Sequence, residues 1–167
     1  SAMDVAKIIA VLSHPEQTQQ LSDLYGVGNA KAPRLPLILV PTTAGTGSEV
    51  TPISIVTTGA TSKTGIVSPI LYADVAILDA NFTRNLPAQI TAATGIDAMV
   101  HAIEAYTSKI KKNAYSDLLA KHALRLLDQN LKLVLEDSNN MKARQNMLFG
   151  SMLAGQAFAN APVAAVH

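Results

Sequence analysis

The sequence predicts an α/β part followed by an all-helical part, and three observations lead to this prediction. Before residue 86, short apolar runs end in Gly, Ser or Thr, as do strands that are buried on both faces of an α/β layer. From Pro87 onward the chain is rich in Ala, Leu and Met at helical spacing. The 167 residues, 49% of them hydrophobic, suffice for one ordinary core or two small ones. We therefore expect two domain parts, 1–86 and 87–167.

The first part opens with a predicted helix from Asp4 to Leu12. Its apolar residues recur at the spacing of one helical face, and the Ser-His-Pro sequence at 13–15 ends it. A linker punctuated by proline then leads to Leu-Ile-Leu-Val at 37–40, a short apolar run that is typical of a buried strand. Directly after this run, residues 41–49 read Pro-Thr-Thr-Ala-Gly-Thr-Gly-Ser-Glu, a loop rich in small and hydroxyl side chains.

Two more apolar runs, 53–57 and 75–78, are predicted as strands, and residues 59–65 form a turn region after the first of them. Lys63 lies between these two runs. Taken alone, this lysine is more simply a solvated surface residue than a ligand for a phosphate or a ribose.

The second part begins where Pro87 opens a helix. A long helix follows, one face of which carries five apolar residues, Leu119, Ala123, Leu126, Leu127 and Leu131. Asn139 or Asn140 is placed to cap a further helix. No strand is predicted in this part.

Composition excludes several classes of function. The formal net charge is +1, and apart from lysines at 109, 111 and 112 the basic residues are scattered, so nucleic acid is not an expected partner. There is no cysteine, so any metal must be bound by oxygen and nitrogen ligands. No apolar run is long enough for a membrane span and the opening residues do not form a secretory signal. We expect a cytoplasmic protein with no membrane partner.

Asp97 and His101 form the strongest local chemical signal. Residues four apart share one face of a helix, so the carboxylate and the imidazole point the same way and are placed to bind one divalent ion. Such a donor set suits iron, zinc, nickel or manganese without choosing between them. By spacing alone a hydrogen bond or a solvated face is the better interpretation. Small residues surround the pair, however, which predicts that both side chains are buried, and a buried pair needs a partner or a metal.

Two further features stay open at this level. Glu104 follows His101 by three residues, and it is equally well an outer partner that orients a metal ligand or an ordinary surface glutamate. The loop at 42–49 offers hydroxyls and backbone amides after a strand, where α/β folds place a nucleotide. It is neither a P-loop nor a G-x-G-x-x-G fingerprint, so by itself it is more often only a turn. His14 and His122 are expected to be solvated.

Several motifs occur in the order of one known family over nearly the whole chain. They are the 41–49 loop, the stretch 76–104 with Thr-Gly-Ile-Asp at 94–97, and Ala-Gly-Gln-Ala-Phe-Ala-Asn-Ala at 154–161 leading into Ala-Val-His at 165–167. In these motifs the sequence resembles the iron-containing, or group III, alcohol dehydrogenases. The opening residues 1–7 are similar to the end of that family's Gly-Gly-Gly-Ser-x-x-Asp-x-x-Lys phosphate loop.

The resemblance implies part of a Rossmann-like nucleotide-binding α/β domain followed by part of a helical metal-binding domain, the fold shared with dehydroquinate synthase. It implies Asp97, His101 and His167 as ligands of one divalent metal, iron in the first place and zinc as the alternative. It also implies binding of NAD or NADP by seven residues, Ser1, Asp4, Thr42, Thr43, Thr46, Ser48 and Lys63. The family's fourth metal ligand has no counterpart here, so we expect an internal fragment.

The activity that the resemblance implies is the interconversion of a small-molecule alcohol and its aldehyde or ketone, with the metal polarising the substrate oxygen. As an isolated polypeptide we expect little or no turnover. The alternatives are a glycerol dehydrogenase or a dehydroquinate synthase-like lyase of the same superfamily, or a non-catalytic helical fragment. No residue is predicted as a general acid or base, and a homo-oligomer is possible.

Overall fold

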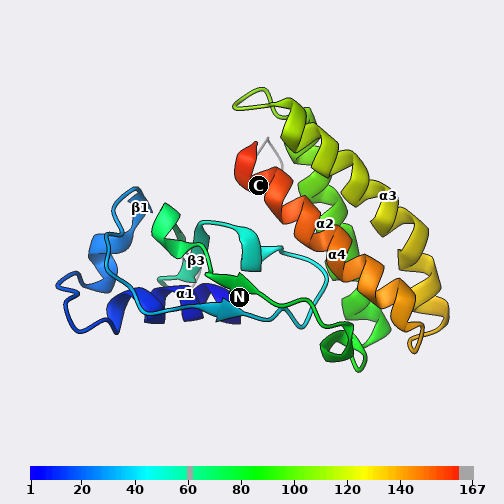
Figure 1. The fold of residues 1–167 in the computed structure, drawn as a ribbon, viewed down its shortest axis with the longest axis horizontal. Coiled ribbons are helices and arrows are strands. Elements are labelled where there is room, and N and C mark those ends of the chain that lie inside the picture. The colour runs from blue at the N-terminus through cyan, green and yellow to red at the C-terminus, as the bar shows by residue number, and fades with distance from the viewer. Residues whose placement is uncertain (60–61, 162–167) are drawn as a thin grey trace. The chain divides into compact units, whose positions relative to one another are not determined.

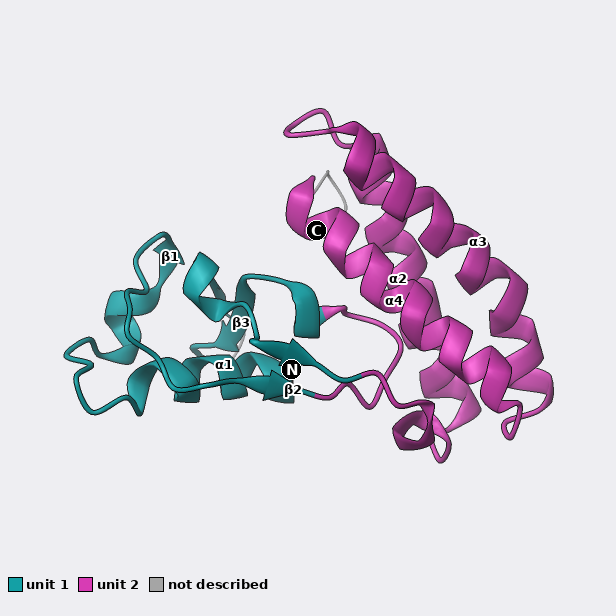
Figure 2. Ribbon diagram, viewed as in Figure 1, with its two compact units in different colours: residues 1–39, 48–77 teal, residues 40–47, 78–167 magenta. Residues whose placement is uncertain are grey.

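The computed structural model describes residues 1–59 and 62–161, and its chain divides into two compact units (Figures 1 and 2). The first, called here the α/β unit, consists of Ser1–Leu39 and Ser48–Ile77, drawn in teal in Figure 2. The second, called the helical unit, consists of Val40–Gly47 and Leu78–His167, drawn in magenta. The loop at 41–49 therefore begins in the helical unit and ends in the α/β unit.

The α/β unit contains helix α1 (Ala2–Leu12) and two small sheets. In the first sheet β4 (Lys63–Val67) lies between β1 (Gly26–Val27) and β3 (Ile53–Thr57), parallel to β1 and antiparallel to β3. In the second, β2 (Ile38–Leu39) pairs in parallel with β5 (Val75–Ala76). Three 3-10 helices complete the unit, η1 (Leu21–Leu24), η2 (Ser48–Val50) and η3 (Pro69–Leu71).

Helix α1 forms as its sequence predicts. Ser1 is the N-cap of a capping box: its side chain accepts from the Asp4 backbone N–H, and the Asp4 carboxylate accepts from the Ser1 amino group. One apolar face then packs into a core with the first sheet and the 3-10 helices, through Ile8, Val11, Leu24, Ile66 and Leu71. Burial of this face stabilises a helix of only 11 residues, which is marginal in isolation.

The strand predictions are confirmed in position and corrected in detail. β3 occupies 53–57 as predicted, but the strand β4 was not predicted: its first residues fall in the expected turn region, and Thr57 pairs with Lys63 and Ile55 with Gly65 in an antiparallel ladder. Lys63 therefore lies in a strand and not in a turn. The expected burial of strands on both faces is wrong for β2, where Ile38 is 59% exposed and Leu39 is 3% exposed.

The helical unit contains three long helices, α2 (Ala88–Thr107), α3 (Ala114–Glu136) and α4 (Met141–Asn160), together with the 3-10 helix η4 (Ala80–Thr83). Asn113 and Asn140 cap α3 and α4, which confirms the second asparagine of the predicted pair, and Pro87 stands at the N-cap of α2. Fully buried alanines line the contacts between the helices, among them Ala98, Ala102, Ala120, Ala123 and Ala154. Such short side chains let the helix backbones approach closely. None of the helices in the described part of the chain is long and apolar enough to cross a membrane.

Residues 78–86 pack with the helices. Arg144 of α4 is 3% exposed, and its guanidinium donates from Nη1 to the carbonyl oxygen of Thr83 at 2.6 Å. This contact joins η4 to α4. The chain therefore leaves the α/β unit after Ile77, and residues from Leu78 onward belong to the helical unit. The division into domains at residue 86 stays a prediction.

Candidate functional site

Helix α2 carries the predicted metal pair. Asp97 Oδ1 and His101 Nε2 lie 3.9 Å apart, one helical turn from each other. The His101 side chain is 11% exposed, whereas that of Asp97 is 38% exposed. The prediction that both are buried is therefore wrong for Asp97. The reason is its position on the helix: Ala98 and Ala102 occupy the face that packs on the neighbouring helices, and Asp97 stands at the edge of that face.

The pair has the chemistry and nearly the spacing of two ligands of one divalent ion. Donors that share such an ion tetrahedrally at about 2.1 Å lie roughly 3.5 Å apart, so a small side-chain rotation brings these two into place. The His101 ring packs against Phe158 of α4, with centroids 5.1 Å apart and planes at 49°. Among the described residues no third His, Cys, Asp or Glu completes a group of three, and His167 lies outside the described residues.

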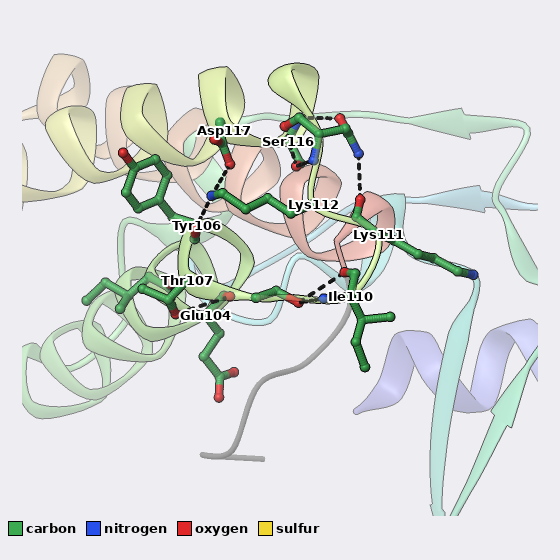
Figure 3. Close-up of polar contacts among 11 residues, drawn as sticks. Glu104, Tyr106, Thr107, Ile110, Lys111, Lys112, Ser116 and Asp117 are labelled. Atoms are coloured by element: carbon green, nitrogen blue, oxygen red, sulfur yellow. Dashed lines mark hydrogen bonds and ion pairs between the residues drawn. The ribbon is translucent and has the colours of Figure 1, made fainter.

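Glu104 is buried, with 2% of its surface exposed, so the interpretation as an ordinary surface glutamate is wrong. Figure 3 shows its side chain directed away from the loop that carries the three lysines. In that loop Lys112 forms an ion pair of 2.6 Å with Asp117 and stands 4.2 Å from the centre of the Tyr106 ring. Part of the short basic cluster is therefore neutralised locally.

The name Gly/Thr loop is used here for residues 40–53, which comprise the loop at 41–49 and the residues up to Ile53. Its first half, residues 40–47, packs tightly against two helices of its own unit. A Cβ atom on Gly47 would lie 2.7 Å from Gly155 Cα of α4, and Gly47 has φ +59°, which disfavours any other residue. A Cβ on Gly45 would lie 2.9 Å from Thr94 Cβ of α2. Ser151 of α4 donates from Oγ to the Gly45 carbonyl oxygen at 3.1 Å. Thr94 lies three residues before Asp97, so this contact connects the loop to the helix that bears the metal pair.

The same half-loop divides its side chains between two environments. Ala44, Gly45 and Gly47 are buried, whereas Thr42 and Thr46 are exposed and Thr43 is half-buried. Packing on the helices therefore involves the small residues, and the threonine side chains are the more exposed ones. This is the arrangement that a loop needs if its hydroxyls are to contact a ligand.

The second half of the loop, from Ser48 to Ile53, is held by a buried polar cluster in the α/β unit. Ser48 donates from Oγ to Asp4 Oδ1 at 2.7 Å, so the structure brings together two residues of the predicted cofactor set. Lys7, which donates to Ser48, is fully buried, and Glu49 is 2% exposed. Burial lowers the pKa of Lys7 to about 8, against the opposing effect of the Asp4 and Glu49 charges. Burial likewise raises the pKa of the Glu49 carboxyl.

The remaining predicted cofactor residues occupy separate places. Ser1 is exposed at the N-cap of α1, and Lys63 is exposed at the start of β4. Lys7 is the residue of this region to which the sequence assigned no role. Its only signal was its place at the end of the phosphate-loop motif, because burial of a lysine depends on contacts 41 to 46 residues away along the chain.

Comparison with known proteins decides the family. The family described as "Iron-containing alcohol dehydrogenase" matches residues 1–80, and that described as "Fe-containing alcohol dehydrogenase family, C-terminal" matches residues 91–167. The chain belongs to the iron-containing alcohol dehydrogenase family. The predicted resemblance and the predicted fold, an α/β part followed by a helical part, are thereby confirmed.

Relatives of this iron-containing alcohol dehydrogenase chain match it along its length. Long-chain-alcohol dehydrogenase 1 of Geobacillus thermodenitrificans is 45% identical over the whole chain, which spans 42% of that protein. The crystal structure of a 1,3-propanediol oxidoreductase superposes with a TM-score of 0.90 at 39% identity, over 98% of this chain and 42% of that one. Sulfoacetaldehyde reductase from Bifidobacterium kashiwanohense, solved in complex with NAD+, gives 0.84 at 37% identity, over 97% and 43%. The chain thus spans less than half the length of these relatives.

Proposed function

We propose that the protein is a metal-dependent alcohol dehydrogenase, which interconverts an alcohol and its aldehyde or ketone with NAD or NADP as the hydride carrier. The relatives named above are called dehydrogenases, oxidoreductases and reductases of alcohols and an aldehyde, which supports this reaction class. The complex of one of them with NAD+ supports the nicotinamide cofactor.

One observation carries the proposal: the first half of the Gly/Thr loop, residues 40–47, and the metal pair belong to one compact unit and are connected through Thr94. Gly45 packs on Thr94 of α2, and one turn further along that helix stands Asp97. Ser151 and Gly155 of α4 hold the same loop, and three residues after Gly155 the ring of Phe158 packs on His101. The first half of the proposed cofactor loop thus packs on α2, which carries Asp97 and His101, and on α4, which contacts His101 through Phe158.

The reaction needs one task from the metal ligands and another from the threonines of the loop. In the oxidation direction the alcohol carbon gives a hydride to the nicotinamide, and the alcohol hydroxyl gives up a proton. A divalent ion, when bound, supplies Lewis-acid polarisation of the substrate oxygen. Asp97 and His101 would hold that ion together with His167, and the hydroxyls of Thr42, Thr43 and Thr46 would contact the cofactor. The helices α2 and α4 keep the two sets at a constant spacing, which is what hydride transfer requires.

The test uses the full-length protein with primary alcohols and NAD+ or NADP+, following the absorbance of the reduced nicotinamide, together with measurement of bound iron and zinc. Asp97→Asn and His101→Ala are each expected to lower turnover by at least about 100-fold and to lower bound metal, because each removes a ligand. His14→Ala, at a half-buried loop position of the α/β unit, is the control and should change neither. Full turnover by both α2 variants at reduced metal content would contradict the proposal.

A further inference from the structure

Lys7 makes an unusual set of contacts for a fully buried lysine. Its Nζ donates to Ser48 Oγ at 3.0 Å, to the Thr51 carbonyl oxygen at 2.9 Å, to Thr51 Oγ1 at 3.3 Å and to the Ile53 carbonyl oxygen at 2.8 Å. All four acceptors belong to the segment that directly follows the first half of the Gly/Thr loop. One side chain of α1 therefore contacts three residues, Ser48, Thr51 and Ile53, which are spread over the segment 48–53.

The same segment is tied to the first turn of α1 by two further hydrogen bonds. Ser48 Oγ accepts a hydrogen bond from Lys7 and donates one to Asp4 Oδ1, at 2.7 Å. Ser54 donates from Oγ to the Asp4 carbonyl oxygen at 3.0 Å. The chain of contacts runs from Lys7 through Ser48 to Asp4, which lies in the turn assigned to the cofactor phosphates.

The contacts suit the charged form of Lys7. An ammonium group has three hydrogens to donate, and the four oxygen acceptors around Nζ can share them. A neutral amine has two hydrogens, one fewer than the three nearest acceptors, Ser48 Oγ and the carbonyl oxygens of Thr51 and Ile53. Deprotonation would also remove one positive charge beside the Asp4 carboxylate and so make the surroundings of the phosphate site more negative.

We propose that Lys7 is a positioning residue for the dinucleotide cofactor: its ammonium group sets residues 48–53 and the first turn of α1 in the conformation that binds the anionic pyrophosphate. This role rests on the proposed function, because it presupposes a cofactor at that turn. Lys7 is fully buried and so acts through Ser48 and Asp4 without touching the ligand itself.

The elements packed against α1 contribute few charges to this cluster. Of β3, η2 and η3, only η2 carries a titratable residue, Glu49, and α1 itself contributes Asp4. The Ser1 amino group, at the N-cap of α1, forms an ion pair with Asp4 at 2.8 Å. Both carboxylates favour the ammonium form of Lys7, and burial opposes it more strongly. Because the pKa of Lys7 is lowered to about 8, Lys7 loses its charge within the pH range in which cofactor binding can be measured.

The test is the dissociation constant of NAD+ or NADP+, measured by calorimetry on the full-length protein from about pH 7 to about pH 9.5. We expect affinity to fall as pH rises through the pKa of Lys7. Lys7→Met should bind about 10- to 100-fold more weakly at pH 7 and should lose this pH step. Lys7→Arg keeps the charge at every pH, so it should restore part of the affinity and show no step. Lys31→Met, which removes an exposed lysine of the same unit, is the control and should follow the wild type.

A flat wild-type profile, or a folded Lys7→Met protein with wild-type affinity, would overturn the role of Lys7. A flat wild-type profile overturns the role even if neither Lys7 variant folds. Thr51→Val adds a milder test, because it removes one acceptor while keeping the lysine: affinity should be lower at every pH and the step should remain. A wild-type protein that binds neither nucleotide at pH 7 would contradict the proposed function as well, and that result differs from a flat profile.

Discussion

The two halves of the Gly/Thr loop are held by opposite kinds of interaction. Residues 40–47 lie against α2 and α4 through close packing of small residues, with one hydrogen bond from Ser151. Residues 48–53 lie against α1 through a buried charge and its hydrogen bonds. Packing of uncharged groups does not depend on pH, whereas a buried ammonium does. In one continuous segment, the packing of Gly47 on α4 leaves no room for an added atom, whereas the contacts of residues 48–53 with Lys7 depend on the ionisation of the lysine.

The largest expected effect comes from breaking the packed half. Gly47→Ala adds a Cβ that meets Gly155 Cα at 2.7 Å and also strains a backbone at φ +59°. Overpacking and strain together should lower the free energy of unfolding by about 2 to 4 kcal/mol, measured by chemical denaturation. Gly28→Ala is the matched control, since Gly28 has φ +75° but no atom within 4 Å of the added Cβ. Equal losses for the two variants would show that close packing against α4 contributes nothing.

The next largest effect concerns residues 48–53 and Lys7, whose contribution to the free energy of unfolding should depend on pH. The pKa of Lys7 is lowered from 10.5 to about 8 in the folded protein, so the unfolded chain binds the extra proton between these values. The wild type should therefore gain stability relative to Lys7→Met as pH rises from about 8 to 10.5, by up to about 3 kcal/mol, and lose it as pH falls through 8. The measurement is the difference in unfolding free energy between the two proteins at several pH values. For Gly47→Ala the corresponding difference from the wild type should stay constant over this range.

The smallest effect tests the one hydrogen bond in the packed half. Ser151→Ala removes the donor to the Gly45 carbonyl oxygen, inside a site where Ser151 is 1% exposed. We expect a loss of about 1 kcal/mol, because the carbonyl is left without that partner. Ser138→Ala, at an exposed position between α3 and α4, should remain within about 0.5 kcal/mol of the wild type. A loss for Ser151→Ala as large as that for Gly47→Ala would mean that the hydrogen bond, and not the packing, holds this half-loop.

Periodicity and capping residues were sufficient to predict most of the regular structure. The apolar spacing in 4–12 and the asparagine before Met141 each produced the predicted helix, because both signals act within a few residues. The sequence did not predict β4 at all, because its pairing with β3 overrides a turn-like composition rich in Gly, Ser and Thr. Strand ends depend on a partner, whereas helix ends depend mainly on local residues.

The candidate site shows the same division between local and distant contacts. The spacing of Asp97 and His101 placed them on one helical face, and the structure confirms that they are neighbours at 3.9 Å. Their unequal exposure could not be predicted, since it depends on which face of α2 meets α3 and α4. Their role as metal ligands, with His167 as a third, stays a prediction.

The sequence by itself determined the family, the order of an α/β part and a helical part, and the positions of the motifs, because each is encoded in short stretches of residue types. Only the tertiary structure decided which atoms hold the Gly/Thr loop. Lys7 reaches residues 41 to 46 positions away, and Ser151 reaches one 106 positions away. Burial of a charge or exclusion of a Cβ atom arises when distant segments meet, so it has no signature in the residues on either side.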